Sequence, residues 1–381
     1  MSEPAPTGSA MDEGRRARIL EHLHRSSDPD GFVPFDRFME IALYGAGVGF
    51  YARESSPFGR SGDYYTAAHV SPLFGRAIAE RVLSTARALP EQRTLRVLEV
   101  GPGDGILGES VVAGIASDPR MRERVEYVLV DRSESLSARA FERVSATGQS
   151  VGIPVRAASG VGADGPFMGF VLANELLDAQ PARRLQWDGQ DWLELGVRLA
   201  NDGWVSAHAP RTRPIPLPGL PSSATPGTVL EVSPMAEGIL REVADHLVAG
   251  CFLVLDYGME ESELLSAHPS GTLSAVRRHR VLDDPIADPG SSDLSVFVNF
   301  TRLRAVAARA GLREVGFLRQ AEALGRWGFP NLLEEAIRTA PSPEAEVRIR
   351  LAAKNLLFGF ERFSALELAP PEGAPAAAVV T

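Results

Sequence analysis

The chain has 381 residues, a formal net charge of −10, and an ordinary globular balance of 44% hydrophobic and 23% charged residues. This length exceeds one compact domain, so we expect one main domain with additions. The acidic balance argues against nucleic acid as the main partner, because phosphate binding needs clustered basic side chains, and the single cysteine excludes an internal disulfide.

Both ends of the chain have few residues that could build a core. The first residues, "MSEPAPTGSAMDEG", are small and polar, without the basic start and apolar stretch of a signal peptide. No apolar run reaches the roughly 20 residues of a membrane-spanning helix. We therefore expect a cytoplasmic protein without membrane contact, with disordered ends over residues 1–14 and 369–381.

The N-terminal quarter is expected to be helical. Apolar residues recur at helical spacing over 12–26, 35–44 and 72–89, while 46–71 is rich in Gly, Tyr and Ser and reads as an ordered loop. We assign 15–90 to a segment that covers the substrate.

From residue 95 onward, apolar strands alternate with helices. Such alternation indicates an α/β fold, a Rossmann-like parallel sheet with helices on both faces. The expected strands are 95–100, 125–131, 170–175, 229–233, 251–258, 293–300 and 313–320, and the expected helices are 105–116, 133–147, 234–248 and 301–311.

An insertion of about fifty residues interrupts this alternation. Residues 183–199 alternate around an Asp-Gly pair, which predicts a β-hairpin, and a proline-rich loop follows. The insertion, 181–228, divides the core into 91–180 and 229–330, and it could serve as a lid, a dimer surface or a partner-docking arm. Helices are expected over 331–368.

The glycine-rich stretch "EVGPGDG" ends the first core strand. Gly103, Gly105 and Gly108 match G-x-G-x-x-G, the dinucleotide pattern, whereas Glu99, Gly101, Gly103 and Gly105 match E-x-G-x-G-x-G, a loop that holds S-adenosylmethionine. A tight turn without ligand is the third alternative. It is disfavoured because so many glycines cost conformational entropy that packing alone seldom repays.

The charge of this loop favours S-adenosyl-L-methionine. Glu99 and Asp104 would each repel a pyrophosphate about 4 Å away by roughly 1 to 4 kcal/mol. S-adenosylmethionine has no phosphate, and it carries an ammonium and a sulfonium that a nearby carboxylate stabilises. The expected loop contacts to this cofactor come from Glu99, Gly101, Pro102, Gly103 and Gly105.

Polar residues follow the next two core strands. Asp131 is placed to accept hydrogen bonds from ribose hydroxyls, although it could instead support a helix cap. Asn174, Glu175 and Asp178 follow the third strand, at the edge where ligands bind in open α/β sheets. They could also be ordinary loop residues, but active-site lining is the favoured interpretation.

At these residues the chain resembles the MidA family of S-adenosylmethionine-dependent methyltransferases, whose mitochondrial members methylate an arginine on a respiratory complex I subunit. The similarity spans about 33–330 and rests on "FMEIALYGAGVGFYAR", "GRSGDYYTAAHVSPLFGR", "EVGPGDG", "ANELLDAQP", "LDYG", "RRHR" and "PGSSDLSVFVNF" in the family's order. It implies a class I methyltransferase sheet with an N-terminal helical extension and the inserted hairpin and loop.

The resemblance also implies roles for residues that composition leaves unassigned. It implies that Asn174, Glu175 and Asp178 lie beside the transferred methyl, and that Asp63 belongs to the catalytic set. Gly62, Asp63, Tyr64 and Thr66 would help close the cofactor site.

The chain departs from the family pattern at four places. Asp104 replaces an arginine, Ala68 and His69 replace a Pro-Glu pair, Gln180 replaces a leucine, and Asn299 replaces an aspartate. These changes leave the acceptor open.

Acidic side chains are the candidates for holding an acceptor. A protein arginine would pair with carboxylates, because guanidinium groups bind them bidentately. His279 could take a proton from an acceptor, although a lone histidine is more often structural, and His69 is a weaker candidate. No metal site or covalent intermediate is expected. The carboxylate candidates are Glu175, Asp178, Asp63 and Asp256.

Three functions remain open at this point. The first is N-methylation of a protein arginine, and the second is N-, O- or C-methylation of a small molecule or peptide in a biosynthetic pathway. The third is a non-catalytic assembly factor, which the intact glycine loop disfavours. A homodimer is also left open.

Overall fold

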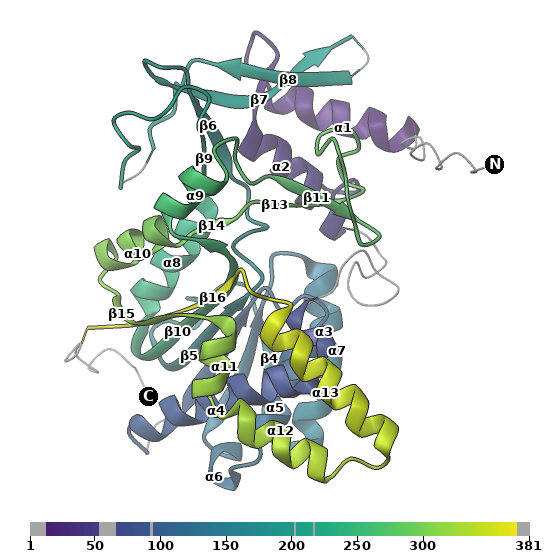
Figure 1. Ribbon diagram of the computed structural model, residues 1–381, viewed down its shortest axis with the longest axis vertical. Coiled ribbons are helices and arrows are strands. Elements are labelled where there is room, and N and C mark those ends of the chain that lie inside the picture. The colour runs from purple at the N-terminus through teal and green to yellow at the C-terminus, as the bar shows by residue number, and fades with distance from the viewer. Residues whose placement is uncertain (1–12, 53–65, 92–93, 202, 216–217, 372–381) are drawn as a thin grey trace.

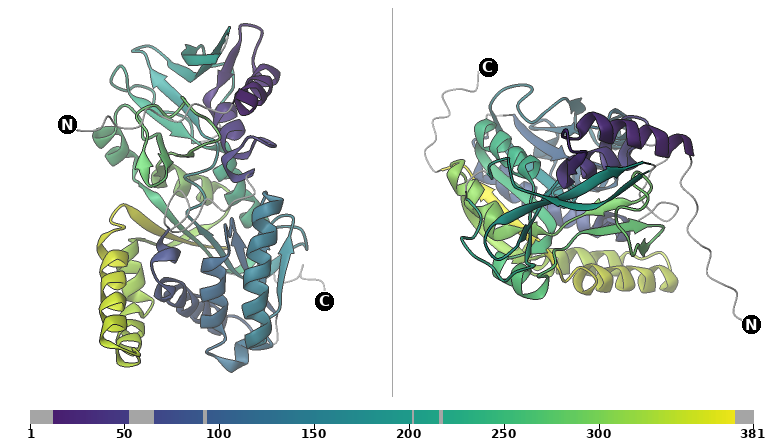
Figure 2. Two further views of the ribbon diagram at one scale, coloured as in Figure 1. Left: turned by 90° about the vertical axis from the view of Figure 1, so that its right-hand side faces the viewer. Right: turned by 90° about the horizontal axis from the view of Figure 1, so that it is seen from above.

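The computed structural model describes residues 13–52, 66–91, 94–201, 203–215 and 218–371. They form a lower lobe around a large sheet and an upper lobe around two smaller sheets (Figure 1, Figure 2). The chain crosses between the lobes several times, so neither lobe is one continuous segment. The expected N-terminal segment, 15–90, is therefore divided between the two lobes.

The large sheet has the strand order β15-β16-β10-β5-β2-β3-β4. From β4 to β10 neighbouring strands run parallel, which confirms the prediction from the apolar strands. β16 is antiparallel to both of its neighbours, and β14 adds a short pairing to β10. The bounds are β2 (Leu95–Val100), β3 (Val125–Val130), β4 (Val155–Ala158), β5 (Phe167–Asn174), β10 (Leu247–Met259), β14 (Val298–Asn299), β15 (Arg313–Arg319) and β16 (Phe363–Ala369).

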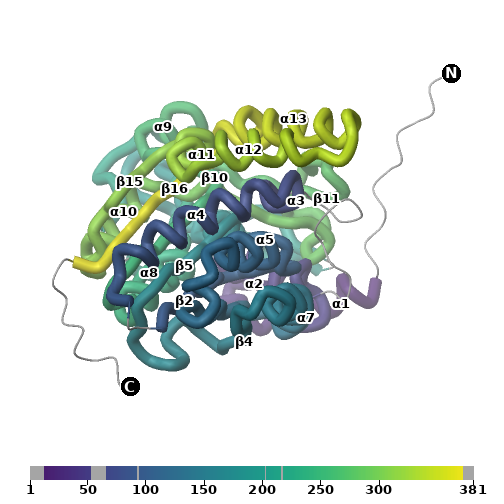
Figure 3. Tube along the Cα trace, turned by 90° about the horizontal axis from the view of Figure 1, so that it is seen from below, coloured from purple at the N-terminus to yellow at the C-terminus, as the bar shows by residue number. Residues whose placement is uncertain are grey.

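Helices cover both faces of this sheet, and each face has its own cluster of buried apolar side chains. None of the described helices is long and apolar enough to cross a bilayer. One face carries α3 (Ala67–Val70), α4 (Pro72–Ala88), α5 (Ile106–Ile115), α6 (Pro119–Arg122), α7 (Glu134–Val151), α11 (Gln320–Arg326), α12 (Phe329–Arg338) and α13 (Pro343–Phe358) (Figure 3). The other carries α8 (Pro234–His246) and α10 (Phe300–Arg309), with α9 (Glu261–Ala267) beside α10.

Local capping explains where several of these helices begin. Ser133, Ser233 and Ser342 each accept a hydrogen bond from the backbone N–H three residues further on. Such a cap stabilises a helix by about 0.5–2 kcal/mol. Gly152, with φ +80°, ends α7 in the left-handed conformation that glycine adopts without strain.

The upper lobe combines the N-terminus, the insertion and a later segment. It contains a five-stranded sheet, a three-stranded sheet, the α-helices α1 and α2 and the short 3-10 helix η1. The bounds are α1 (Glu13–Ser26), β1 (Phe32–Pro34), α2 (Phe35–Tyr44), η1 (Phe50–Ala52), β6 (Arg183–Trp187), β7 (Trp192–Ala200), β8 (Gly203–Ala209), β9 (Val229–Val232), β11 (Ser274–Arg277), β12 (Arg280–Val281) and β13 (Asp293–Ser295).

Three strand predictions need correction. The strand expected over 293–300 is divided into β13 in the upper lobe and β14 beside β10, and Phe300 begins α10. β9, expected in the core sheet, pairs with β6 in the upper lobe, because its apolar run alone does not specify a partner. The C-terminal segment 331–368 is not wholly helical, since Phe363–Ala369 forms β16 between the edge strand β15 and β10. The predicted hairpin of the insertion is confirmed as β6 and β7.

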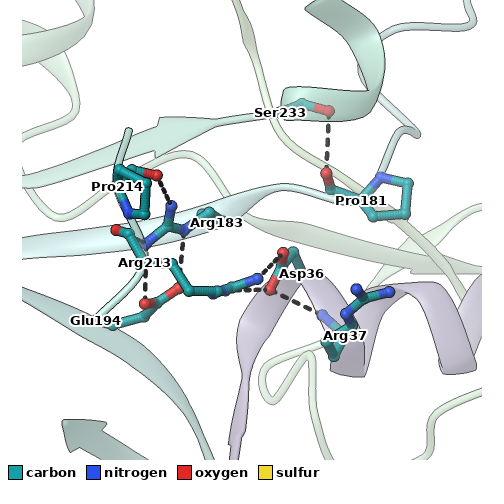
Figure 4. A network of polar contacts seen from close by, with 8 residues as sticks. All are labelled: Asp36, Arg37, Pro181, Arg183, Glu194, Arg213, Pro214 and Ser233. Atoms are coloured by element: carbon teal, nitrogen blue, oxygen red, sulfur yellow. Dashed lines mark hydrogen bonds and ion pairs between the residues drawn. The ribbon is translucent and has the colours of Figure 1, made fainter. Parts of the chain in front are cut away.

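A buried ionic network fastens the insertion to the N-terminal helix α2 (Figure 4). Arg183 and Glu194, whose side chains are each 3% exposed, form a bidentate pair with both N–O distances at 2.9 Å. Arg213 bridges Glu194 to Asp36 of α2, and Arg183 also donates to the carbonyl oxygen of Pro214. The network therefore anchors the start of the proline-rich loop.

Candidate active site

A cavity of about 370 Å³ lies where the carboxyl ends of β2, β3 and β5 meet residues from the upper lobe. Ligands bind at this edge in open α/β sheets, so the cavity occupies the position that the topology favours. The upper lobe contributes Tyr44 and Tyr51. The lower lobe contributes Thr66, Ala68, His69, Glu99, Val100, Gly101, Pro102, Gly103, Asp104, Asp131, Asn174, Glu175, Ala179 and Gln180, among others.

The glycines of the loop after β2 are required by the backbone. Gly101, Gly103 and Gly105 have φ values of +69°, +57° and +81°. A Cβ on Gly101 would lie 2.5 Å from a methyl group of Leu176, so a larger residue would collide with the turn after β5. Gly108 lies in α5, where a Cβ would come within 2.6 Å of Glu99 Oε2. This last glycine therefore makes room for the acid.

Glu99 is buried at the floor of the cavity and is only 2% exposed. Its Oε2 accepts a hydrogen bond of 2.8 Å from the hydroxyl of Tyr127. Burial raises the pKa of Glu99 to about 7, with the Tyr127 hydrogen bond acting against this and the charges of Asp104 and Asp131 adding to it. A ligand cation would relieve this electrostatic cost.

Asp131 supports the start of α7 and also lines the cavity. Its Oδ1 accepts a hydrogen bond of 2.7 Å from the backbone N–H of Ser133, the residue that caps α7. It also lines the cavity, and burial raises its pKa to about 6.

The turn after β5 presents the polar residues that the sequence analysis selected. Asn174 Oδ1 is buried beside the cavity and has no hydrogen-bond partner among the described residues. Glu175 has a φ of +49°, an arrangement that costs about 1–3 kcal/mol for a residue other than glycine. Its Oε1 accepts a hydrogen bond of 3.0 Å from the N–H of Ala67, and burial, followed by the charge of Asp256, raises its pKa to about 8.

Asp256 was expected to hold an acceptor, but in the structure it binds the backbone of the turn after β5. It is fully buried, and its Oδ2 accepts hydrogen bonds from the backbone N–H groups of Leu176 and Leu177 at 3.1 and 2.8 Å. It does not line the cavity. Its carboxylate is therefore committed to the backbone.

Asp178 lies in the same acidic group but not in the cavity wall. Its Oδ1 is buried without a hydrogen-bond partner among the described residues. Burial, and then the charges of Asp256, Asp293 and Glu175, raise the pKa of Asp178 well above its usual value. Sequence reasoning did not single out Asp293, which comes from β13 and accepts a hydrogen bond from the hydroxyl of Tyr51 at 2.8 Å.

The two candidate histidines have different positions. His69 lines the cavity, with its Nδ1 2.7 Å from Thr66 Oγ1 and its Nε2 3.3 Å from Asp104 Oδ2. His279 lies exposed in the turn between β11 and β12 with a φ of +62° and does not line the cavity, which corrects its expected catalytic placement. His279 is one of the two central residues of a tight hairpin turn, a type that requires left-handed backbone at both, which accounts for this φ.

Three expected site residues, Gly62, Asp63 and Tyr64, lie outside the described residues. Sequence reasoning missed an aromatic roof formed by Tyr44 and Tyr51, whose stacked rings have centroids 5.4 Å apart. Arg132 lies 4.1 Å from the centre of the Tyr44 ring and pairs with Glu40 of α2. The segment "FMEIALYGAGVGFYAR" contains both tyrosines, but nothing in it placed them at the cavity, because the contact of Tyr44 with Arg132 joins separate lobes.

Fold and site together define a class of enzyme. Five parallel strands are followed by an antiparallel strand inserted before the last one, and an acid and a glycine turn lie at the end of the first core strand. The protein is therefore a class I S-adenosyl-L-methionine-dependent methyltransferase with a Rossmann-like sheet.

Comparison with known families agrees with this class. A family model described as an S-adenosyl-L-methionine-dependent methyltransferase matches residues 77–318. The chain belongs to this family, which confirms the fold, cofactor and enzyme class that the MidA resemblance implied.

Curated relatives and a solved structure extend the match to most of the chain. It is 27% identical to "Protein arginine methyltransferase NDUFAF7 homolog, mitochondrial" of Drosophila melanogaster, over 80% of this chain and 74% of the relative. The human protein of that name is 24% identical, over 96% and 86% of the two chains. A Burkholderia thailandensis crystal structure with bound S-adenosyl-homocysteine has a TM-score of 0.81 and 29% identity, covering 97% of this chain and 95% of that one.

The prediction of a cytoplasmic protein is contradicted by these relatives, whose names describe them as mitochondrial. That prediction rested on a small, polar N-terminal composition and on the lack of a long apolar run. These two properties bear on whether a segment enters a membrane. They do not distinguish the cytoplasm from the interior of a mitochondrion.

Proposed function

We propose that the protein transfers the methyl group of S-adenosyl-L-methionine to a guanidinium nitrogen of a protein arginine. The observation that carries this proposal is the acidic group at the acceptor end of the cavity, Glu175 with Asp178, Asp256 and Asp293 behind it. The names of the curated relatives, protein arginine methyltransferases, support the same acceptor.

Electrostatics explains why an acidic group suits this acceptor. Burial and mutual repulsion raise the pKa of Glu175 to about 8, so its carboxyl group is largely protonated at neutral pH without a cation beside it. A guanidinium would favour the ionised form and form charge-assisted hydrogen bonds with it. A neutral hydroxyl acceptor would gain no such stabilisation.

The cavity also suits the methyl donor. Its acids match the positive charges of the donor, and the buried Asn174 Oδ1 offers an acceptor to a ligand donor group. We assign the contacts to Glu99 and the glycine loop, with Asp131 for the ribose hydroxyls. When bound, S-adenosyl-L-methionine supplies a methyl group activated by a sulfonium.

The chain's own residues then have to hold the acceptor and exclude water. Glu175 Oε1 is held by the N–H of Ala67, which leaves Oε2 to pair with the guanidinium and to take the proton that the methylated nitrogen releases. The aromatic roof of Tyr44 and Tyr51 closes the cavity on the upper side. Such alignment can supply roughly 7 to 11 kcal/mol of the barrier reduction.

The test is methyl transfer from labelled S-adenosyl-L-methionine into a cell lysate and, separately, into a small-molecule extract. We expect label in protein, and after acid hydrolysis we expect it in methylarginine. Glu175→Gln should reduce the rate at least a hundredfold. Glu109→Gln, a half-exposed acid of α5 outside the cavity wall, should not.

Label in the extract and none in protein would replace the protein arginine with a small-molecule acceptor. Absence of transfer to either, with cofactor binding intact, would leave the non-catalytic assembly factor.

A further inference from the structure

A single turn of helix, α3, touches both halves of the cavity. At one end, His69 Nε2 lies 3.3 Å from Asp104 Oδ2 inside the glycine loop. At the other end, the N–H of Ala67 donates to Glu175 Oε1 at 3.0 Å. The cofactor loop and the carboxylate assigned to the acceptor are therefore joined through only three residues of chain.

The hydrogen bonds of His69 are consistent with a fixed ring. Burial alone would raise the pKa of Asp104, but the hydrogen bond and charge of His69, with Arg143 beyond, lower it, so Asp104 is a carboxylate. A carboxylate can only accept, so Nε2 carries a proton and donates. Nδ1 lies 2.7 Å from the Thr66 hydroxyl, the residue that precedes α3. The imidazole ring of His69 therefore links α3 both to Thr66, the residue before the helix, and to Asp104 of the glycine loop.

We propose that His69 is a positioning residue that locks α3 to the glycine loop through Asp104, so that cofactor binding and the placement of Glu175 are coupled. The half of this proposal that concerns Glu175 rests on the proposed function, whereas the half that concerns the glycine loop does not. Asp104 acts as the anchor, because its Oδ1 also accepts from the N–H of Ile106 at the start of α5.

Two substitutions separate the contacts of the ring. The amide of His69→Gln lies near the position of Nε2 and can still donate to Asp104, while the amide of His69→Asn lies near Nδ1 and reaches only Thr66. Arg143→Gln is the matched control, since Arg143 lies 3.7 Å from the same Asp104 oxygen but is 40% exposed.

The readouts are the Kd for S-adenosyl-homocysteine by calorimetry, kcat with the acceptor, and the melting temperature. We expect His69→Asn to raise this Kd about tenfold and to lower kcat by a similar factor, as the loss of a hydrogen bond to a charged group does. His69→Gln and Arg143→Gln should stay within about threefold of the wild type. The two His69 variants should have similar melting temperatures.

Equal impairment of the two His69 variants, or unchanged Kd in both, would overturn the proposal. A merely structural role would lower both melting temperatures without separating Asn from Gln. The calorimetry needs no acceptor, so it decides the role of His69 even if the protein-arginine assignment fails. A normal kcat in His69→Asn despite a raised Kd would refute the coupling to Glu175.

Discussion

Glu175 joins a buried carboxyl group to a backbone φ of +49°, and both features cost folding free energy. The chain could avoid both with a glycine or an asparagine at this position. Its hydrogen bond from Ala67 holds the carboxyl group in place against this cost. The combination is typical of a residue retained for chemistry rather than for stability.

The pKa of Glu175 predicts two dependences on pH. Its value is 4.5 in the unfolded chain and about 8 in the folded protein, so between these limits only the folded state holds the proton. Stability should therefore fall as pH rises through this window, by at most about 5 kcal/mol from this group. Binding of a guanidinium needs the ionised form, so kcat/KM should rise with pH up to about 8.

Glu175→Gln tests both dependences. Denaturant titrations from pH 5 to 9 should show the variant gaining stability relative to the wild type as pH increases, and its kcat/KM should be low and flat. An unchanged rise of kcat/KM in the variant would assign the titration to another group.

A second prediction at the residue scale separates the backbone strain of replacing a glycine from the steric collision of the added side chain. Gly101→Ala and Gly152→Ala both place a side chain on left-handed backbone, but only Gly101 also faces a collision, with Leu176 at 2.5 Å. Gly152→Ala should cost about 1 kcal/mol of stability and leave cofactor binding unchanged. Gly101→Ala should lose measurable binding of S-adenosyl-homocysteine by calorimetry. Equal binding by the two variants would show that the loop can shift.

At the scale of elements, the buried network of Arg183, Glu194 and Arg213 decides how the insertion is held. Removing one partner of a buried ion pair leaves the other charge uncompensated, at a cost of about 3–5 kcal/mol. Glu194→Gln should therefore lower stability by that amount and make the loop near Arg213 more susceptible to limited proteolysis.

A surface pair provides the control for this prediction. Glu346→Gln breaks an exposed i,i+4 contact with Arg350 on α13 and should change stability by less than about 0.5 kcal/mol. Comparable losses in the two variants, measured by urea denaturation, would argue against a special role for the network.

Some helices and strands could be predicted from the periodicity of apolar residues alone. Helix α2 and strand β2 have the bounds that periodicity predicted, because each buries one continuous set of side chains. The residues of β16, "FSALELA", were expected to be helical. They form a strand because they pair with β10 and β15, which a local pattern does not show. Local propensity is a weak prior when long-range pairing determines the backbone conformation.

At the scale of the whole molecule, the cavity lies between two lobes. Tyr44 and Tyr51 of the upper lobe share its wall with the glycine loop of the lower lobe. S-adenosyl-homocysteine should therefore slow amide hydrogen exchange in α2 and η1 as well as in the turns after β2, β3 and β5. Protection confined to the lower lobe would show that the upper lobe does not close on the cofactor.

Sequence by itself determined the parallel core, the cofactor and the polar turn after β5. Glu99, the glycines and Asn174 to Asp178 lie within short segments whose spacing reports their chemistry. Only the tertiary structure decided that Asp293 joins the acidic group, that His69 faces the glycine loop while His279 does not, and that β9 belongs to the upper lobe. These contacts join residues far apart in the chain, and no local pattern records which distant surfaces fold together.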